Sequence, residues 1–119
     1  MATAVKRKLS GSTDGKAIKV TQTATAGDTI HTSVAGTTEG TFDEIWLWAF
    51  NSHTANLALT IEFGGTGAPD QAIVVTVPFR AGLIPIVPGF ILQNEMVVRA
   101  FAASANLITI NGFVNRITD

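Results

Sequence analysis

The chain has 119 residues, no cysteine and a formal net charge of −1. This length suits one domain with its own hydrophobic core, and the lack of cysteine excludes disulfides, thiolate metal sites and thiol catalysis. No apolar run approaches the roughly 20 residues of a membrane helix, and the first residues lack the apolar centre of a secretion signal. The sequence therefore predicts a soluble protein made in the cytoplasm.

Basic residues concentrate near the N-terminus. Residues 1–19 carry five Lys or Arg and one Asp, a charge of +4, whereas the remaining residues carry three basic and eight acidic side chains, a charge of −5. We expect residues 1–15 to form a basic arm and residues 16–119 to form the folded domain. Lys6, Arg7 and Lys8 would be mobile until they met an acidic protein surface or phosphates, and a solvated tail is the alternative.

The first half of the domain predicts short strands and no helix. Residues 17–25 alternate in polarity, the segment 26–28 turns the chain, and residues 29–34 form a second strand. Residues 35–41, rich in threonine and glycine, form a loop. Strands of this length, separated by turns, are typical of an all-β protein.

Residues 45–50 contain the most informative pattern. A side-chain period of two separates two sets of residues: Ile45, Leu47 and Ala49 on one face, and Trp46, Trp48 and Phe50 on the other. Both faces are apolar, whereas a strand in a two-layer β protein normally turns one face to water. The extra apolar face predicts that another subunit covers it. A polar turn at residues 51–56 then leads to a half-buried strand at residues 57–63.

The second half of the chain predicts four more strands, at residues 73–77, 83–87, 96–102 and 107–117. Pro85 cannot donate to a ladder, so its strand lies at a sheet edge or bends there. Gly112 indicates a bulge or a close backbone approach, and residues 103–106 are expected to close a hairpin. With no internal repeat, the pattern predicts a single all-β domain of about eight antiparallel strands, a β-sandwich or jelly roll.

Residues able to do chemistry are sparse. His31 and His53 lack the spacing of metal ligands and are expected at the surface. Asp43 and Glu44 are adjacent, so an extended chain points them to opposite sides, which argues against a glycosidase pair. No serine has the context of a catalytic triad, and the glycine-rich segment 64–67 lacks the lysine and helix of a phosphate loop. The sequence thus predicts no catalytic residue, no metal ligand and no cofactor.

Five segments carry a family resemblance: Lys8–Gly15 with Ile18–Val20, Asp43–Asn51, Ile61–Gly65, Val87–Gly89, and Gly112–Thr118. They are similar to segments of the small all-β decoration, or cement, proteins of tailed bacteriophage heads, over nearly the whole chain. The resemblance implies a jelly-roll-like sandwich, self-association commonly as a homotrimer, and binding to the outside of an assembled, expanded capsid. It also implies an arm that reaches across capsid subunits, a part that Lys6, Arg7 and Lys8 could play by their location.

We therefore expect a structural, non-enzymatic protein on the exterior of a virion. Its partners would be the major capsid protein and its own copies, with no direct nucleic-acid contact and no membrane. Trp46, Trp48 and Phe50 would lie at a subunit or capsid interface. One alternative is a carbohydrate-binding or host-attachment module in which Trp46 and Trp48 stack on sugar rings; another is a small β-barrel enzyme whose site the sequence does not reveal.

Overall fold

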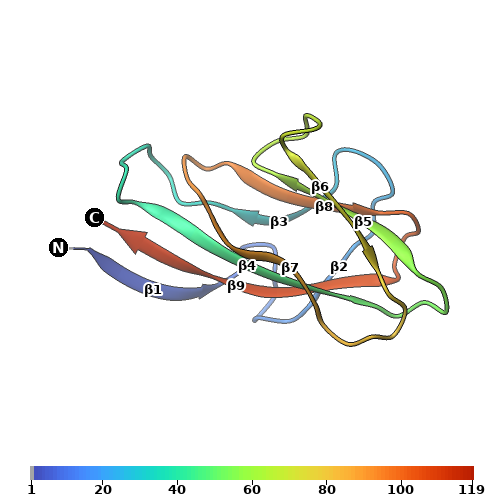
Figure 1. Cartoon of the computed structure of the whole chain (residues 1–119). Coiled ribbons are helices and arrows are strands. Elements are labelled where there is room, and N and C mark those ends of the chain that lie inside the picture. Colours follow the sequence, from blue (N-terminus) through green and yellow to red (C-terminus); the bar gives the residue numbers. More distant parts are fainter. Residues whose placement is uncertain (1) are drawn as a thin grey trace.

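The computed structural model describes residues 2–119, which fold into nine strands in two antiparallel sheets (Figure 1). The first sheet contains β1 (Thr3–Lys8), β2 (Ile18–Lys19), β4 (Phe42–Asn51), β7 (Ile84–Leu92) and β9 (Ile108–Thr118). The second sheet contains β3 (Asp28–Thr32), β5 (Leu57–Phe63), β6 (Ala72–Val77) and β8 (Val97–Ala102). The all-β sandwich predicted from the sequence is confirmed. Within residues 2–119, no helix is long and apolar enough to cross a membrane.

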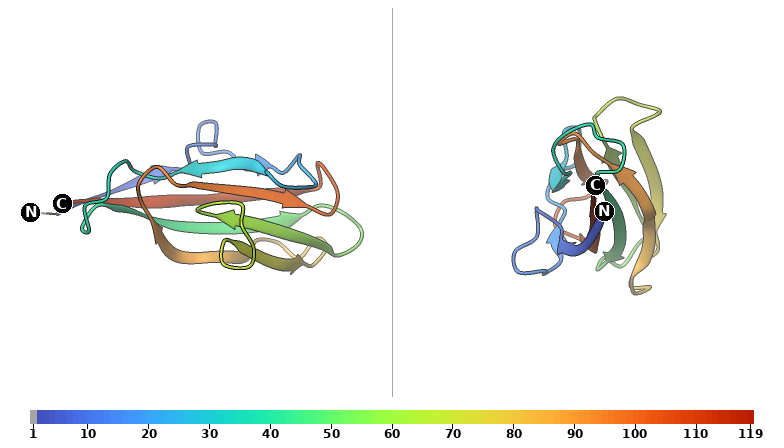
Figure 2. Two further views of the ribbon diagram at one scale, coloured as in Figure 1. Left: turned by 90° about the horizontal axis from the view of Figure 1, so that it is seen from above. Right: turned by 90° about the vertical axis from the view of Figure 1, so that its left-hand side faces the viewer.

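The strand order is the one that results when a long antiparallel hairpin folds over itself into two layers. The first sheet runs β1-β9-β4-β7 and the second runs β3-β8-β5-β6. Four nested antiparallel pairs follow from this order: β1 with β9, β3 with β8, β4 with β7, and β5 with β6. Such nesting across two packed sheets is typical of a jelly roll. The sandwich is elongated, 49 × 27 × 21 Å, and both ends of the chain lie at one tip (Figure 2).

β1 and β2 are two pieces of one interrupted edge. β1 pairs with residues 113–118 of β9, and β2 pairs with Thr109 and Ile110 of the same strand. The nine strands therefore occupy eight positions in the sandwich, in line with the predicted number. The expectation of a separate, mobile arm at residues 1–15 is wrong, because residues 3–8 are hydrogen-bonded into the sheet and Leu9 is buried in the core.

β4 lies in the interior of the first sheet, between β9 and β7. Its alternation is as predicted: Ile45, Leu47 and Ala49 are fully buried between the sheets, and the residues between them, on the outer face, are half-buried. Apolar residues of β3, β5, β8 and β9 complete the core from the facing layer and the neighbouring strand: Ile30, Leu59, Ile61, Val98, Ala100, Ile108, Ile110 and Val114.

Six of the eight connections cross between the sheets, and two of these are short polar segments. The turn at residues 51–56 leads from β4 in the first sheet to β5 in the second, and buried Asn51 holds it by donating to the carbonyls of Ala55 and Val77 at 3.0 and 2.9 Å. Residues 103–106 likewise join β8 to β9 across the layers, so the hairpin expected there is wrong. Alternating polarity identifies each strand but not the sheet that it joins.

Two predictions about backbone geometry are confirmed. A Cβ atom at Gly112 would lie 2.1 Å from the carbonyl oxygen of Trp46, so this position requires glycine for close approach of β9 and β4. Pro85 lies on β7, which is the edge strand of the first sheet and departs from regular register beside Trp48.

Candidate interaction surfaces

Three aromatic rings form a ladder on the outer face of the first sheet. The centroids of Trp46, Trp48 and Phe113 lie 6.0–6.4 Å apart, with interplanar angles of 15–25°. The sequence predicted Trp46 and Trp48 on one face together with Phe50, which is also half-buried there. It missed Phe113, which lies opposite Trp46 on β9. The sequence could have placed Phe113 on the outer face, because this residue is an odd number of positions from the buried Ile108, Ile110 and Val114.

Neighbouring side chains hold this aromatic ladder in place. The Lys6 ammonium lies 4.2 Å from the centroid of the Phe113 ring, a cation–π contact. Trp46 packs over Gly89 of β7, where an added Cβ would lie 2.7 Å from the indole Cζ2. The Glu44 carboxylate accepts hydrogen bonds from Trp46 Nε1 at 2.7 Å and from Asn115 Nδ2 at 3.1 Å, and these bonds lower the pKa of Glu44. The ladder is therefore a fixed, half-buried apolar strip.

A second apolar surface lies along one side of the sandwich, where β6 and β7 are the edge strands of the two sheets (Figure 2). Five large apolar side chains on these strands and the segment between them are 52–67% exposed. We call this surface the β6–β7 edge: Val74, Phe79, Leu83, Phe90 and Ile91. It adjoins the aromatic ladder, because Pro88 of β7 pairs with Trp46 of β4.

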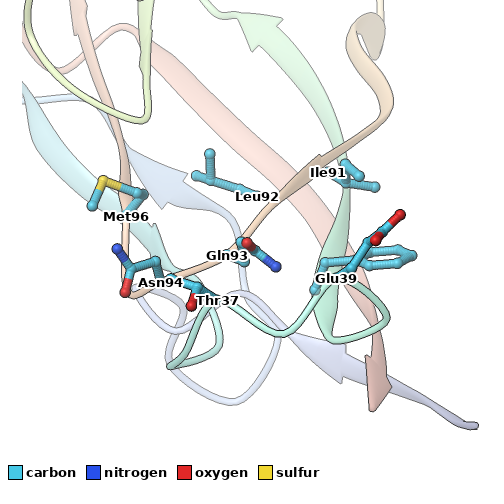
Figure 3. Close-up of a pocket in the computed structure, with 8 residues that line it drawn as sticks. Thr37, Glu39, Ile91, Leu92, Gln93, Asn94 and Met96 are labelled. Atoms are coloured by element: carbon cyan, nitrogen blue, oxygen red, sulfur yellow. The ribbon is translucent and has the colours of Figure 1, made fainter. Parts of the chain in front are cut away.

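A groove of about 470 Å³ extends this apolar surface toward the tip of the sandwich. Figure 3 shows its lining, in which Ile91, Leu92 and Met96 supply apolar surface and Thr37, Glu39, Gln93 and Asn94 supply polar groups, with Phe42 completing the wall. Gln93 Nε2 donates to the carbonyls of Thr38 and Thr41 at 2.9 and 2.8 Å, which fixes the adjoining loop.

A buried polar cluster joins the two sheets near the same tip. Asp43, fully buried on β4, accepts four hydrogen bonds. They come from His31 Nε2 at 2.7 Å, Arg116 Nε at 2.8 Å, Arg116 Nη2 at 2.9 Å and the Val34 N–H at 3.1 Å. A carboxylate has about four acceptor positions, so these donors satisfy it. The sequence did not predict this cluster, although Asp43 falls in phase with the buried Ile45 and Leu47.

The protonation state of the cluster follows from its hydrogen bonds. Burial would raise the pKa of Asp43, but bonds from Arg116 and His31 outweigh it and hold that pKa below its ordinary value. Burial lowers the pKa of His31, despite the neighbouring Asp43. His31 Nδ1 accepts the Ser10 N–H at 3.0 Å, so the neutral ring carries its proton on Nε2 and donates it to Asp43. Both ring nitrogens are thereby engaged, which leaves none to act as a base.

The predicted surface position of His31 is wrong, since this residue is 1% exposed. His53 is half-exposed in the turn after β4. Among residues 2–119, no group of three or more His, Cys, Asp or Glu side chains could hold a metal ion. Asp43 points into the core and Glu44 to the outer face, so the predicted opposition of these two carboxylates is confirmed.

A pocket of about 410 Å³ lies over the buried cluster. We call it the basic pocket, and it is lined by Arg7, Lys8, Ser10, His31 and Arg116. The fold thus separates the three basic residues that were expected to act together. Arg7 and Lys8 line the pocket with Arg116, whereas Lys6 lies on the outer face against Phe113.

The chain was also compared with known proteins. No protein-family model, no curated protein and no solved structure matches it.

Proposed function

We propose that this chain is a structural virion protein that binds the outer surface of an assembled bacteriophage capsid as a homotrimer and stabilises the shell. The observation that supports this proposal best is the β6–β7 edge, because several large, exposed apolar side chains along one side of a protein are typical of a protein–protein interface. The resemblance of five sequence segments to phage decoration proteins supports the particular role.

The two apolar surfaces suit different partners. The side chains of the β6–β7 edge are more than half exposed, and we assign them to contacts between copies of this chain. Trp46, Trp48 and Phe50 are half-buried on the outer face of the first sheet, and we assign that face to the capsid. Prolines at positions 85 and 88 keep β7 from extending the sheet, so copies would associate through side chains rather than through strand pairing.

The role requires no chemistry. A protein that binds the assembled shell and not its free subunits stabilises the shell by mass action. Several weak contacts, repeated over a symmetric oligomer and a symmetric lattice, give avidity without any tight single contact.

The test compares binding to undecorated mature particles with binding to the isolated capsid protein. We expect affinity for particles to be higher by about 10²-fold or more, and saturation to raise the temperature at which particles break. Equal affinity for free subunits would contradict the proposal.

Light scattering tests the oligomer separately. The expected mass is three times that of one chain, and Leu83→Ser should reduce it. Val5→Ser is the matched control, because Val5 is a comparably exposed apolar residue on β1, at the opposite side of the sandwich. A monomer at high micromolar concentration would contradict the assignment of the β6–β7 edge to contacts between copies of this chain.

A second candidate is a carbohydrate-binding or host-attachment module. Three nearly parallel rings on a sheet face favour it, because aromatic faces stack on sugars. Lys6 over Phe113 and Gly89 against Trp46 oppose it, since both take up ring surface that a sugar would use. Glycan binding that is lost in Trp48→Ala would support this candidate over the capsid role.

A further inference from the structure

The basic pocket presents hydrogen-bond donors and positive charge, with its acceptors already engaged. Its one underlying carboxylate, Asp43, is satisfied by His31, Arg116 and the Val34 N–H. His31 is neutral, with both nitrogens bonded. Arg116 uses Nε and Nη2 on Asp43, which leaves Nη1 for a further acceptor.

Three other lining groups also retain donors. Among residues 2–119, no hydrogen bond or ion pair engages the Arg7 guanidinium, so all of its N–H groups are available. Lys8 Nζ donates one bond, to the Ser12 carbonyl at 3.1 Å, and keeps two more protons. The Ser10 hydroxyl accepts the Thr32 N–H at 2.7 Å and can donate its own proton. With Arg7, Lys8 and Arg116 against Asp43, the site has a formal charge of +2.

We propose that the basic pocket binds the carboxylate of an Asp or Glu side chain in an acidic segment of a partner protein. The inference rests on the proposed function, because the capsid supplies that segment. Arg7 and Arg116 provide guanidinium groups, whose fork of N–H donors matches a carboxylate. Pairing of β1 with β9 holds the backbone of Arg7 within the sheet, and hydrogen bonds to Asp43 hold the side chain of Arg116. Neither the β1 backbone nor the Arg116 side chain therefore has to become ordered on binding.

A nucleic acid fits this pocket less well than a single carboxylate. Backbone phosphates need a track of cations, whereas here three cations line one pocket of formal charge +2, and the chain has −1 in total, so the rest of it carries −3. This acidic remainder repels a polyanion that extends past the pocket.

The experiment uses three probes on the intact chain at low salt: capped hexaglutamate, capped hexaglutamine and inorganic phosphate. Calorimetry should detect binding of hexaglutamate and none of hexaglutamine. Arg7→Gln removes an exposed side chain that supports no other contact, and it should weaken hexaglutamate binding roughly fivefold. Lys19→Gln, on β2 and outside the pocket, removes the same charge and should leave the affinity unchanged.

Equal weakening by the two variants would overturn the inference, because it would reduce the binding to general charge attraction. Displacement of hexaglutamate by an equal concentration of phosphate would overturn the assignment to a carboxylate.

Particle binding separates this inference from the proposed function. If wild type binds capsids and Arg7→Gln binds them equally well, the pocket is wrong and the function stands. If wild type fails to bind capsids while hexaglutamate binding still depends on Arg7, the function is wrong and the carboxylate pocket stands.

Discussion

His31 Nε2 donates to Asp43 Oδ2 at 2.7 Å, and this bond joins β3 of one sheet to β4 of the other. Both side chains are buried, at 1% and 0% exposure. Arg116 holds the same carboxylate from β9, and Ser10 N–H caps the far nitrogen of the imidazole. One polar cluster therefore ties the two layers together and forms the floor of the basic pocket.

The first prediction is that acid destabilises the fold through His31. Burial lowers the pKa of this imidazole in the folded state, whereas the unfolded chain takes up the proton near pH 6.5. The unfolded state then binds more protons, so the free energy of unfolding should fall by up to about 1.4 kcal/mol per pH unit below about pH 6.5. Further loss should follow at lower pH as Asp43, whose folded pKa is lowered, becomes protonated.

Urea unfolding between about pH 7.5 and pH 5 measures this effect. His31→Gln should flatten the pH dependence, and His53→Gln, in the turn after β4, is the matched control that should preserve it. A dependence of the same slope in His31→Gln would show that another group is responsible.

The second prediction concerns the carboxylate of the cluster. Asp43→Asn removes the charge that Arg116 faces and should lower the free energy of unfolding by about 3 kcal/mol, at the low end for a broken buried pair because Arg116 is partly exposed. Glu44→Gln is the adjacent control on the outer face and should change it by about 1 kcal/mol or less. Denaturant titrations of both variants give the comparison, and similar values for the two would contradict the prediction.

The third prediction tests the close approach of β9 to β4. Gly112→Ala would place a Cβ 2.1 Å from the Trp46 carbonyl oxygen, a backbone atom that cannot move aside without disturbing the hydrogen bonds between β4 and β9. We expect destabilisation of about 3 kcal/mol or more and a clear drop in Tm. Asn111→Ala, on the half-buried outer face beside it, should have a much smaller effect. An unchanged Tm in Gly112→Ala would refute the close approach.

The fourth prediction concerns the contribution of β1 to stability. Deleting residues 1–8 removes β1, uncovers the edge of β9 and takes Lys6 from the Phe113 ring. Because the side chains of β1 are exposed, the loss should be moderate, about 1–3 kcal/mol from the cross-strand contacts. Hydrogen exchange should show faster exchange in residues 113–118 than in the intact chain. A truncated protein as stable as the intact chain would contradict this prediction and support the expectation of a separate, mobile arm.

Local patterns in the sequence determined the strands and their two faces. The alternation of residues 45–50, the proline at position 85 and the glycine at position 112 each express a property of the backbone within a few residues, and each prediction from them is confirmed. The apolar outer face of β4 could be predicted because side chains alternate between the two faces of a strand.

Only the tertiary structure decided which strands pair. A short polar segment can close a hairpin or carry the chain to the opposite sheet, and the choice depends on where distant apolar faces are buried; residues 103–106 therefore cross between layers instead of forming the expected hairpin. The same long-range pairing puts β1 beside β9 and brings Arg7 to Arg116 over the buried Asp43 and His31. Residues this far apart in the chain share no local pattern, so the ordered first strand, the polar cluster and the basic pocket emerge only when the sheets are assembled.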